Sequence, residues 1–289
     1  MGLLKSGFVA VAGRPNVGKS TLVNALAGGK VAITSAVPHT TRRRIFGIAN
    51  DEDSQLVLVD LPGFQRPMDP LTERMQKTVD SSFEDIDAVL FVLSARERIG
   101  AGDNFIAKRI FRLGIPVVIA LNKVDRLKPG HIATQMKTAA RLGDFHALHP
   151  VSAVTGDGIP DLRQELVDLL PEGQPYFPTD RRTSLREEEQ IAELIREKAL
   201  QLTKEEVPHS ISVEIQEISD KVVEATLLVE TESQKGILVG KRGAMIREIG
   251  TRARPEIEQL VGHKVFLQLK VKVKPKWRRD EATLTRLGL

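Results

Sequence analysis

One glycine-rich segment constrains this chain more than any other feature. Residues 13–20 fit the pattern G-x-x-x-x-G-K-[ST], and an apolar run of strand character, residues 8–12, precedes them. A strand that stops in a glycine-rich turn and restarts as a helix directs several backbone N–H groups and a helix N-terminus at one anionic point. The segment therefore predicts a polyphosphate site.

The residue types in this segment predict separate roles at the phosphates. Gly13 and Gly18 permit the turn and the close approach of the backbone. We expect Lys19 to reach the β- and γ-phosphates and the Ser20 hydroxyl to bind Mg²⁺. The predicted phosphate-binding residues are Gly13, Arg14, Pro15, Asn16, Val17, Gly18, Lys19, Ser20 and Thr21.

A second motif specifies the base. Asn122, Lys123 and Asp125 form N-K-x-D directly after the apolar run 117–121. A carboxylate accepts from both N1–H and the exocyclic amine of guanine, whereas adenine offers no such pair of donors. Asp125 therefore predicts GTP rather than ATP, with Asn122 bracing the loop and the Lys123 stem over the base. Taken alone, the motif also fits an ordinary helix-entry turn with Asp as its cap.

A third loop lies between these two motifs and predicts a switch. It follows the apolar run 56–59 and consists of Asp60, Leu61, Pro62 and Gly63. We expect Asp60 to hold Mg²⁺ through water and the Gly63 N–H to sense the γ-phosphate, so that the segment changes between GTP and GDP states. A plain type II turn is the alternative, but the order of the motifs along the chain favours the switch.

A fourth loop, Ser152, Ala153 and Val154, completes the set. It resembles the S-A-K loop whose backbone N–H groups contact guanine O6, and because Val154 replaces the usual lysine, only the backbone contact carries over. With these four loops the chain resembles the translation-factor-related GTPases. The resemblance implies a first switch at Thr40 and Thr41, with Thr41 as the hydroxyl that joins the Mg²⁺ shell and Thr40 as the less favoured candidate.

The residue after the third loop bears on catalysis. Phe64 stands where Ras-like proteins place the glutamine that orients the attacking water, and a phenyl ring does not do this. In similar GTPases, an asparagine at the position of Asn16 helps to coordinate K⁺ where an arginine finger otherwise places its charge. The alternative to K⁺ coordination is that Asn16 only stabilises the turn. Gln65 is a further candidate to replace the missing glutamine, and we favour it less than K⁺.

Length and composition suit a soluble globular protein of two domains. The chain has 289 residues, of which 41% are hydrophobic, and no cysteine. Disulfides and cysteine metal sites are therefore excluded, and no apolar run approaches the roughly 18 residues that cross a bilayer. We expect a cytoplasmic protein, because the N-terminal apolar stretch serves as the first strand and not as a signal peptide.

Alternating patterns divide the chain. Residues 1–170 predict a GTP-binding domain of the α/β class, a P-loop NTPase fold with a mostly parallel sheet and helices on both faces. Its apolar runs are 8–12, 56–59, 88–93 and 117–121. Residues 171–180 contain three prolines and predict a linker. Residues 181–289 then form a second domain without a second phosphate loop.

The second domain is polarised in charge along the sequence. Residues 180–234 carry 7 basic and 14 acidic side chains, whereas residues 235–279 carry 13 basic and 3 acidic ones. We expect the basic side to attract phosphate. It contains a G-x-x-G loop at residues 240–243, a spacing that chance also produces among 22 glycines, so its context decides.

The order of elements supplies that context. Helical patterns cover 187–201, 234–239 and 244–261, and strand patterns cover 210–216, 221–230 and 265–273. The order helix-strand-strand-helix-helix-strand, with G-x-x-G between the last two helices, predicts an α+β KH domain of type II that binds single-stranded RNA. The predicted RNA-binding residues are Gly236, Gly240, Lys241, Arg242, Gly243 and Arg247. For Trp277, base stacking and anchoring in the core are equally open.

Over essentially its full length the chain resembles the Era GTPases of bacteria. The matching segments are 13–20, 40–42, 60–63, 122–125, 208–210, 236–243 and 272–278. The resemblance implies a monomeric, slow GTP hydrolase that binds the 3′ end region of 16S rRNA, assists 30S subunit assembly and attaches peripherally to the inner membrane. The alternative function is a GTP-binding RNA assembly factor or checkpoint with negligible turnover.

Overall fold

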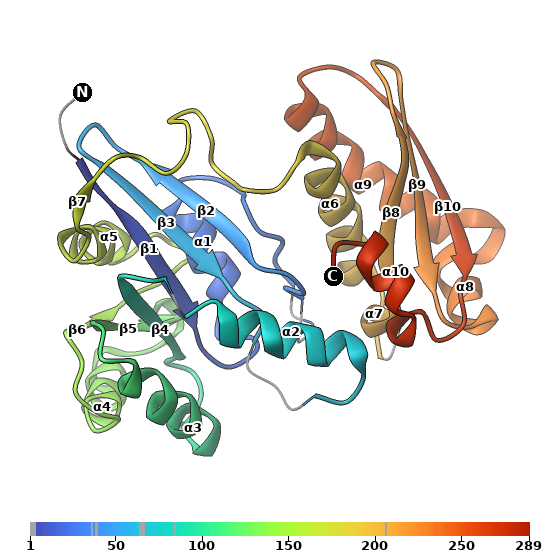
Figure 1. Cartoon of the computed structure of the whole chain (residues 1–289). Helices are drawn as coiled ribbons and strands as arrows, with labels where there is room; N and C mark the ends of the chain where they lie inside the picture. Colours follow the sequence, from blue (N-terminus) through green and yellow to red (C-terminus); the bar gives the residue numbers. More distant parts are fainter. Residues whose placement is uncertain (1–3, 36, 38–39, 64–66, 84, 206) are drawn as a thin grey trace. The chain divides into compact units, whose positions relative to one another are not determined.

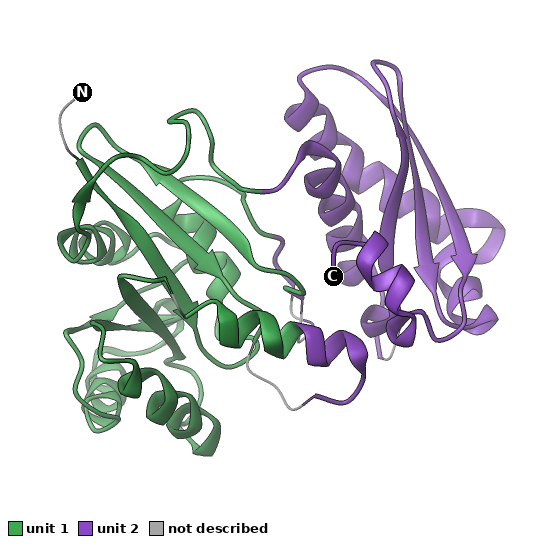
Figure 2. Ribbon diagram, viewed as in Figure 1, with its two compact units in different colours: residues 1–32, 41–66, 75–184 green, residues 33–40, 67–74, 185–289 purple. Residues whose placement is uncertain are grey.

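The computed structural model describes residues 4–35, 37, 40–63, 67–83, 85–205 and 207–289 (Figure 1). The chain forms two compact units, which Figure 2 colours separately. Unit 1 consists of residues 1–32, 41–66 and 75–184, and unit 2 consists of residues 33–40, 67–74 and 185–289. Two short segments from the first third of the chain therefore pack with unit 2.

Unit 1 is built on one sheet with the strand order β2-β3-β1-β4-β5-β6. Its strands are β1 (Leu4–Ala12), β2 (Ile45–Asn50), β3 (Ser54–Asp60), β4 (Ala88–Ser94), β5 (Val117–Asn122) and β6 (Ala147–Pro150), and β7 (Glu172–Gly173) pairs with β1. All pairs are parallel except β2 with β3 and β7 with β1. The predicted α/β class with a mostly parallel sheet is confirmed.

Helices cover both faces of this sheet. They are α1 (Lys19–Leu26), α2 (Pro70–Ser81), of which residues 75–81 belong to unit 1, α3 (Ala101–Ile110), α4 (Pro129–Ala139) and α5 (Ile159–Asp168), with 3-10 turns η1 (Phe111–Leu113) and η2 (Val124–Arg126). Leu90 and Val92 of β4 share a core with α1 and α5, whereas Val89 and Phe91 share a core with α3 and α4. Because successive side chains of a strand point to opposite faces, an uninterrupted apolar strand requires helices on both sides.

The sequence patterns did not include β2. Gly47 stands in the middle of this strand, and a Cβ atom there would lie 2.7 Å from Cγ1 of Val23 on α1. The helix packs so closely on β2 that a side chain at this position would collide with it. The glycine that permits this packing also interrupts the apolar run from which a strand is predicted.

Residues 171–180, predicted as a linker, belong to unit 1. The ring of Tyr176 packs edge-on against Phe8 at a centroid distance of 4.6 Å, and β7 pairs with β1. The chain passes into unit 2 after Ser184. The domain limits 1–170 and 181–289 stay predictions.

Unit 2 contains a three-stranded sheet in the order β10-β9-β8, formed by β8 (Ser212–Ile218), β9 (Val222–Val229) and β10 (Phe266–Val273). Its helices are α6 (Glu187–Leu202), α7 (Val207–Ser210), α8 (Glu232–Val239), α9 (Ala244–Val261) and α10 (Glu281–Arg286), with 3-10 turns η3 (Lys241–Gly243) and η4 (Trp277–Arg279). Apolar side chains of α6 and α9 pack on this sheet. The predicted α+β order of a KH domain is confirmed, and the described helices include none that is long and apolar enough to cross a membrane.

The end of the chain, for which no element was predicted, closes the core of unit 2. Trp277 is fully buried, and its indole Nε1 donates to the carbonyl oxygen of Ser210 at 2.8 Å. Of the two roles considered for Trp277, the structure supports the anchor in the core, because a fully buried ring cannot stack on a base.

Candidate functional site

The phosphate loop requires glycine at both of its predicted positions. Gly18 has φ 100° and precedes α1, and a Cβ atom there would lie 2.4 Å from Nδ2 of Asn122. Gly13 has φ 152°, and its Cβ atom would lie 2.5 Å from the carbonyl oxygen of Val92. Both conformations are unfavourable for other residues. The loop is therefore shaped by its contacts with β4 and β5, the next two strands of the sheet.

Lys19 is held inside the loop. Its Nζ donates to the carbonyl oxygens of Gly13 and Arg14, each at 3.1 Å, and only 7% of the residue is exposed. Burial lowers the pKa of Lys19 to about 8, although the nearby Asp60 carboxylate acts in the opposite direction. The ammonium group is thus positioned among acceptors before an anion arrives.

Three oxygen-bearing side chains from separate loops converge beside Lys19. Ser20 Oγ donates to Asp60 Oδ2 at 2.7 Å, Thr41 Oγ1 donates to the same atom at 3.2 Å, and Ser20 Oγ lies 3.0 Å from Thr41 Oγ1. The hydroxyl of Thr40 instead donates to the Val37 carbonyl oxygen at 2.7 Å. The structure therefore brings Thr41, and not Thr40, to Ser20 and Asp60.

This cluster fits a hard divalent cation. Asp60 is fully buried, and its Oδ1 has no hydrogen-bond partner among the described residues. Burial raises the pKa of Asp60, while the charge of Lys19 and the hydrogen bonds from Ser20 and Thr41 lower it. Hydroxyl and carboxylate oxygens are the ligands that Mg²⁺ prefers, so a metal ion here would balance a carboxylate that the fold has removed from water.

Asn122 joins three of the predicted loops. Its Nδ2 donates to the Val17 carbonyl oxygen at 3.0 Å, and its Oδ1 accepts from the N–H groups of Lys123 at 2.8 Å and Ala153 at 3.1 Å. The Nζ of Lys123 donates to the Asn16 carbonyl oxygen. A single amide thus ties the phosphate loop to the two loops predicted to contact guanine.

Asp125 is positioned by the fourth loop. Its Oδ1 accepts from Ser152 Oγ at 2.8 Å, and Ser152 is itself fully buried. Val154 is 78% exposed, which agrees with a role for its backbone alone. The carboxylate is therefore fixed in place at the carboxyl edge of the sheet, where β5 and β6 end.

The third loop, residues 60–63, which is predicted to act as the second switch, lies against the phosphate loop. Gly63 is buried, and a Cβ atom at this position would lie 3.2 Å from Cγ of Pro15 and 3.4 Å from Nζ of Lys19. Leu61 and Pro62 before it are buried. Phe64 and Gln65, which the sequence connects with hydrolysis, lie outside the described residues.

The sequence patterns missed the residues that hold Arg14. Its Nε donates to Asp103 Oδ1 at 2.7 Å and its Nη2 to Glu97 Oε2 at 3.1 Å. Asp103 is 1% exposed, and its Oδ2 accepts from the Gly100 N–H at 3.0 Å, at the start of α3. An acidic residue three positions after a glycine indicates a helix start, but no sequence rule connects that start to a phosphate loop far away along the chain.

The G-x-x-G loop has a different construction. Gly240 has φ 71°, and a Cβ atom there would lie 2.7 Å from that of Met245, while Gly243 has φ 77° and caps α9. Between them, Arg242 also has a positive φ, 53°. The Gly240 N–H donates to the Gly236 carbonyl oxygen at 2.9 Å, which ends α8. The backbone thus makes a sharp turn in which Gly240 packs closely against Met245, whereas the space at Gly243 is open among the described residues.

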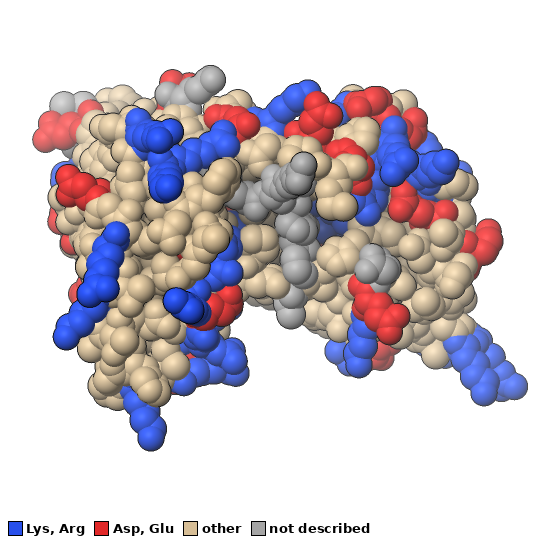
Figure 3. Space-filling model, turned by 90° about the horizontal axis from the view of Figure 1, so that it is seen from below, with Lys and Arg blue, Asp and Glu red and all other residues tan. Residues whose placement is uncertain are grey.

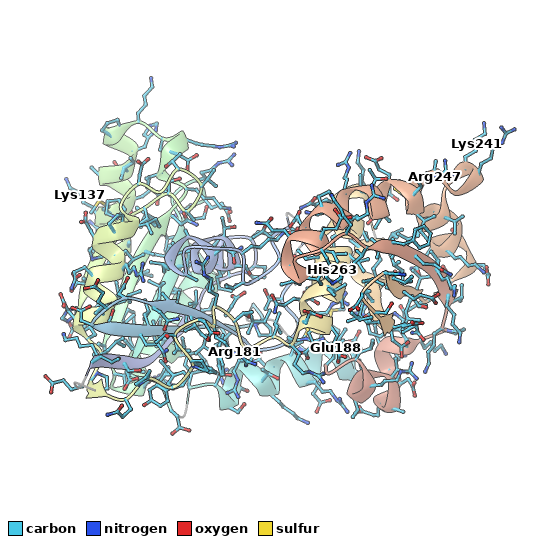
Figure 4. The ribbon with its side chains drawn as sticks, turned by 90° about the horizontal axis from the view of Figure 1, so that it is seen from above. Lys137, Arg181, Glu188, Lys241, Arg247 and His263 are labelled. Carbon is cyan, nitrogen blue, oxygen red and sulfur yellow. The ribbon has the colours of Figure 1, made fainter. Side chains whose placement is uncertain are left out.

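Basic side chains extend from this loop into solvent. Figure 4 shows Lys241 at the tip of the loop and Arg247 further along α9. Within the described residues, Lys241, Arg242 and Arg247 form no ion pair, whereas Lys270 pairs with Glu224 at 3.1 Å. On the face in Figure 3, basic and acidic side chains are interspersed. Unpaired positive charge is therefore present at the loop, and among the described residues of the basic segment Lys272, Lys276 and Arg279 likewise form no ion pair.

Comparisons with known proteins match a GTPase family to unit 1 and a KH family to unit 2. The family described as 50S ribosome-binding GTPase matches residues 8–123, and the KH domain family matches residues 206–278. GTPase Era of Lactobacillus delbrueckii subsp. bulgaricus is 45% identical, with 98% of this chain and 96% of that protein covered. GTPase Era of Lactobacillus helveticus shows the same identity and coverage.

Two crystal structures match nearly the whole chain. A variant of Aquifex aeolicus Era bound to GDP and AlF₄⁻ has a TM-score of 0.95, 37% identity and 99% coverage of both chains. An Era complex with MgGDPNP and nucleotides 1506–1542 of 16S ribosomal RNA has a TM-score of 0.92 at the same identity and coverage. The geometry of the four loops, the KH arrangement and these relatives lead to one conclusion: the chain belongs to the Era family of GTPases.

Proposed function

We propose that unit 1 hydrolyses GTP to GDP and phosphate, and that unit 2 binds RNA in a manner set by the bound nucleotide. The observation that carries the first part is the convergence of Ser20, Thr41 and Asp60 beside the buried ammonium of Lys19. These groups come from the phosphate loop and both switches, so a nucleotide that engages all of them distinguishes GTP from GDP.

The chain's own residues position the reactants. Lys19 and the N–H groups of the phosphate loop, residues 13–21, hold the β- and γ-phosphates, and the Gly63 N–H lies where a γ-phosphate enters. Asp125 accepts from the guanine N1–H and exocyclic amine, and the backbone of the loop Ser152, Ala153 and Val154 serves O6. The fixed donors stabilise charge without reorganising during the reaction.

Mg²⁺ would be held by Ser20 and Thr41 directly and by Asp60 through water. When bound, it neutralises charge that develops on the β- and γ-phosphate oxygens. The fit rests on the buried, unpartnered Oδ1 of Asp60. The MgGDPNP bound to the related Era structure supports this assignment.

We also propose that K⁺ activates hydrolysis at Asn16. The Asn16 backbone has φ 62° and its carbonyl oxygen accepts from Lys123, so the residue is held at the rim of the phosphate loop. A cation there would place positive charge where other GTPases use an arginine finger.

Turnover in K⁺ and in Na⁺ tests this proposal against the alternative of an assembly factor with negligible turnover. We expect hydrolysis well above background in K⁺ and much slower hydrolysis in Na⁺, with Asn16→Ala removing the difference. Equal, near-zero rates in both salts would favour the alternative function. Absence of any GTP or GDP binding by calorimetry would exclude both.

For unit 2 we propose that the G-x-x-G loop binds the 3′ end region of 16S rRNA during assembly of the 30S subunit. The open space at Gly243 lets an RNA backbone approach, and Lys241, Arg242 and Arg247 supply charge. The Era complex with nucleotides 1506–1542 supports this choice of RNA. Filter binding of the full chain to this RNA and to a scrambled sequence tests it, and equal affinity for both would contradict it.

We propose further that the protein acts as a monomer in the cytoplasm, with peripheral contact to the inner membrane. Among the described residues no membrane-spanning helix is found, so any such contact would be a surface one. Sedimentation of the purified chain and fractionation of cells test these points separately.

A further inference from the structure

The side chain of Arg14, a residue of the phosphate loop, lies against the start of helix α3. Its Nε donates to Asp103 Oδ1 at 2.7 Å and its Nη2 to Glu97 Oε2 at 3.1 Å, and 29% of the side chain is exposed. Two donors of one planar guanidinium therefore have carboxylate partners on separate residues, which restricts its rotation. The phosphate loop is thus anchored to the segment that follows β4, within unit 1.

The carboxylate of Asp103 is fixed at both of its oxygens. Only 1% of Asp103 is exposed, and its second oxygen, Oδ2, accepts from the Gly100 N–H at 3.0 Å. The ion pair with Arg14 balances its charge. Because an unpaired carboxylate is costly at such a depth, Asp103 favours the one position of the guanidinium that the structure shows.

Gly102 provides the space for the stem of Arg14. A Cβ atom at this position would lie 2.8 Å from Cδ of Arg14, closer than carbon atoms in contact approach. Gly102 is the second residue of α3, and its φ lies outside the left-handed region, so alanine fits the backbone. Helix propensity alone favours alanine over glycine, and the contact with Arg14 accounts for the glycine.

The backbone of Arg14 contacts Lys19. The Arg14 carbonyl oxygen accepts from Lys19 Nζ at 3.1 Å, and the Gly13 carbonyl oxygen accepts from it at the same distance. The side chain and the carbonyl group of Arg14 share one Cα atom, and the peptide unit that contains the carbonyl is planar. Anchoring the side chain therefore restricts the position of an acceptor that holds the Lys19 ammonium.

We propose that Asp103 and Gly102 are positioning residues of the nucleotide site, which fix Arg14 so that its carbonyl oxygen holds Lys19 for the β- and γ-phosphates. This inference rests on the proposed function and adds to the site a helix that no phosphate motif includes. Because GDP and GTP both carry a β-phosphate, α3 acts on the affinity for both nucleotides and not on the choice between them.

The test compares Gly102→Ala and Asp103→Asn with Gly130→Ala, each in the full chain. Gly130 is the matched control, because it is the exposed second residue of α4 and offers open space to a Cβ atom among the described residues. Both α3 substitutions are also combined with Arg14→Ala. Calorimetry measures the affinity for GDP and for a non-hydrolysable GTP analogue, and urea unfolding measures the free energy of unfolding.

We expect Gly102→Ala and Asp103→Asn each to lose about tenfold in affinity for both nucleotides, the loss of one hydrogen bond to a charged group. Gly102→Ala should keep the free energy of unfolding of the original chain, because alanine is the better helix former. Beside Arg14→Ala, neither substitution should reduce affinity further, since the side chain through which they act is gone. Gly130→Ala should stay within about twofold of the original chain.

Unchanged affinity in both α3 variants, or an equal loss in Gly130→Ala, would overturn the inference. Losses that persist in full beside Arg14→Ala would also overturn it, because such an effect does not pass through Arg14. If Asp103→Asn does not fold, Gly102→Ala decides. If the original chain binds neither GDP nor the GTP analogue, the proposed function fails, and not only this inference.

Discussion

We propose that the nucleotide loops and the G-x-x-G loop both bind phosphate groups, yet they are built in opposite ways. At the nucleotide loops, Lys19, Asp60 and Asn122 are buried and already hydrogen-bonded to neighbouring loops. At the G-x-x-G loop, Lys241 and Arg242 are exposed and form no ion pair within the described residues. The glycines at both loops permit positive φ, but only the nucleotide glycines are enclosed by other strands.

The difference follows from the ligands. A nucleotide with a metal ion is small enough to be surrounded, so its partners can be fixed in advance in a site of low dielectric constant. An RNA strand extends past any one loop, so its affinity comes from exposed charge and from the release of counterions. Four predictions test this contrast, from the largest expected effect to the smallest.

Asp125→Asn should have the largest effect, because it alters a fixed partner of the base. We expect GTP affinity to fall about a hundredfold, the loss of two hydrogen bonds to a charged group, and xanthine nucleotides to gain by comparison. Calorimetry with GTP and XTP measures this. Asp157→Asn, in the exposed neighbouring loop, is the control, and unchanged GTP affinity in Asp125→Asn would reject the assignment of the base site.

Replacing Lys241 and Arg242 by glutamate should act only on RNA. We expect RNA affinity to fall about thirtyfold and the dependence on salt to become weaker, because phosphate contacts are lost, while GTP affinity stays the same. Filter binding at several salt concentrations measures both quantities. The matched control replaces Lys108 and Lys137, two exposed lysines of unit 1, by glutamate, which changes the net charge by the same amount. An equal loss of RNA affinity in this control would indicate a general charge effect.

Raising the pH should weaken GTP binding through Lys19. Burial lowers the pKa of Lys19 to about 8 in the free protein, and the phosphates require its ammonium form, so affinity should fall about tenfold per pH unit above that value. The free energy of unfolding of the free protein should instead rise between about pH 8 and 10.5. In this range Lys19 is still protonated in the unfolded chain, where it has the ordinary lysine pKa of 10.5, but has lost its proton in the folded protein.

Fluorescence titrations between about pH 7 and 9.5 measure the affinity on both sides of the folded-state pKa. In Lys19→Arg the guanidinium stays charged, so the dependence on pH should be absent whatever the affinity of that variant. A steep pH dependence that persists in Lys19→Arg would assign the titration to another group.

Trp277→Phe should have the smallest effect on binding. Loss of the hydrogen bond to the Ser210 carbonyl should lower the free energy of unfolding by about 1–2 kcal/mol, with RNA and GTP affinities within about twofold. Urea unfolding and filter binding measure the two effects. A large loss of RNA affinity without a loss of stability would show that Trp277 reaches the RNA after all.

Much of the fold could be predicted because its signals are local. The apolar runs 8–12, 56–59, 88–93 and 117–121 lie within β1, β3, β4 and β5, and the pattern at 244–261 coincides with α9. The strand β2 was missed because Gly47, which is required for the close contact with α1, interrupts the apolar run of this strand. The elements at 277–286 were missed because they are short and depend on burial of Trp277 in a core formed by distant residues.

The candidate site divides in the same way. The sequence by itself determined which residue types are predicted to meet phosphate, metal and guanine, because a ligand's chemistry dictates residue type and the motifs keep that chemistry within a few consecutive positions. Only the tertiary structure decided that Thr41 rather than Thr40 reaches Asp60 and that Asp103 holds Arg14. These contacts join residues far apart along the chain, and their geometry exists only when the strands and helices that carry them have packed.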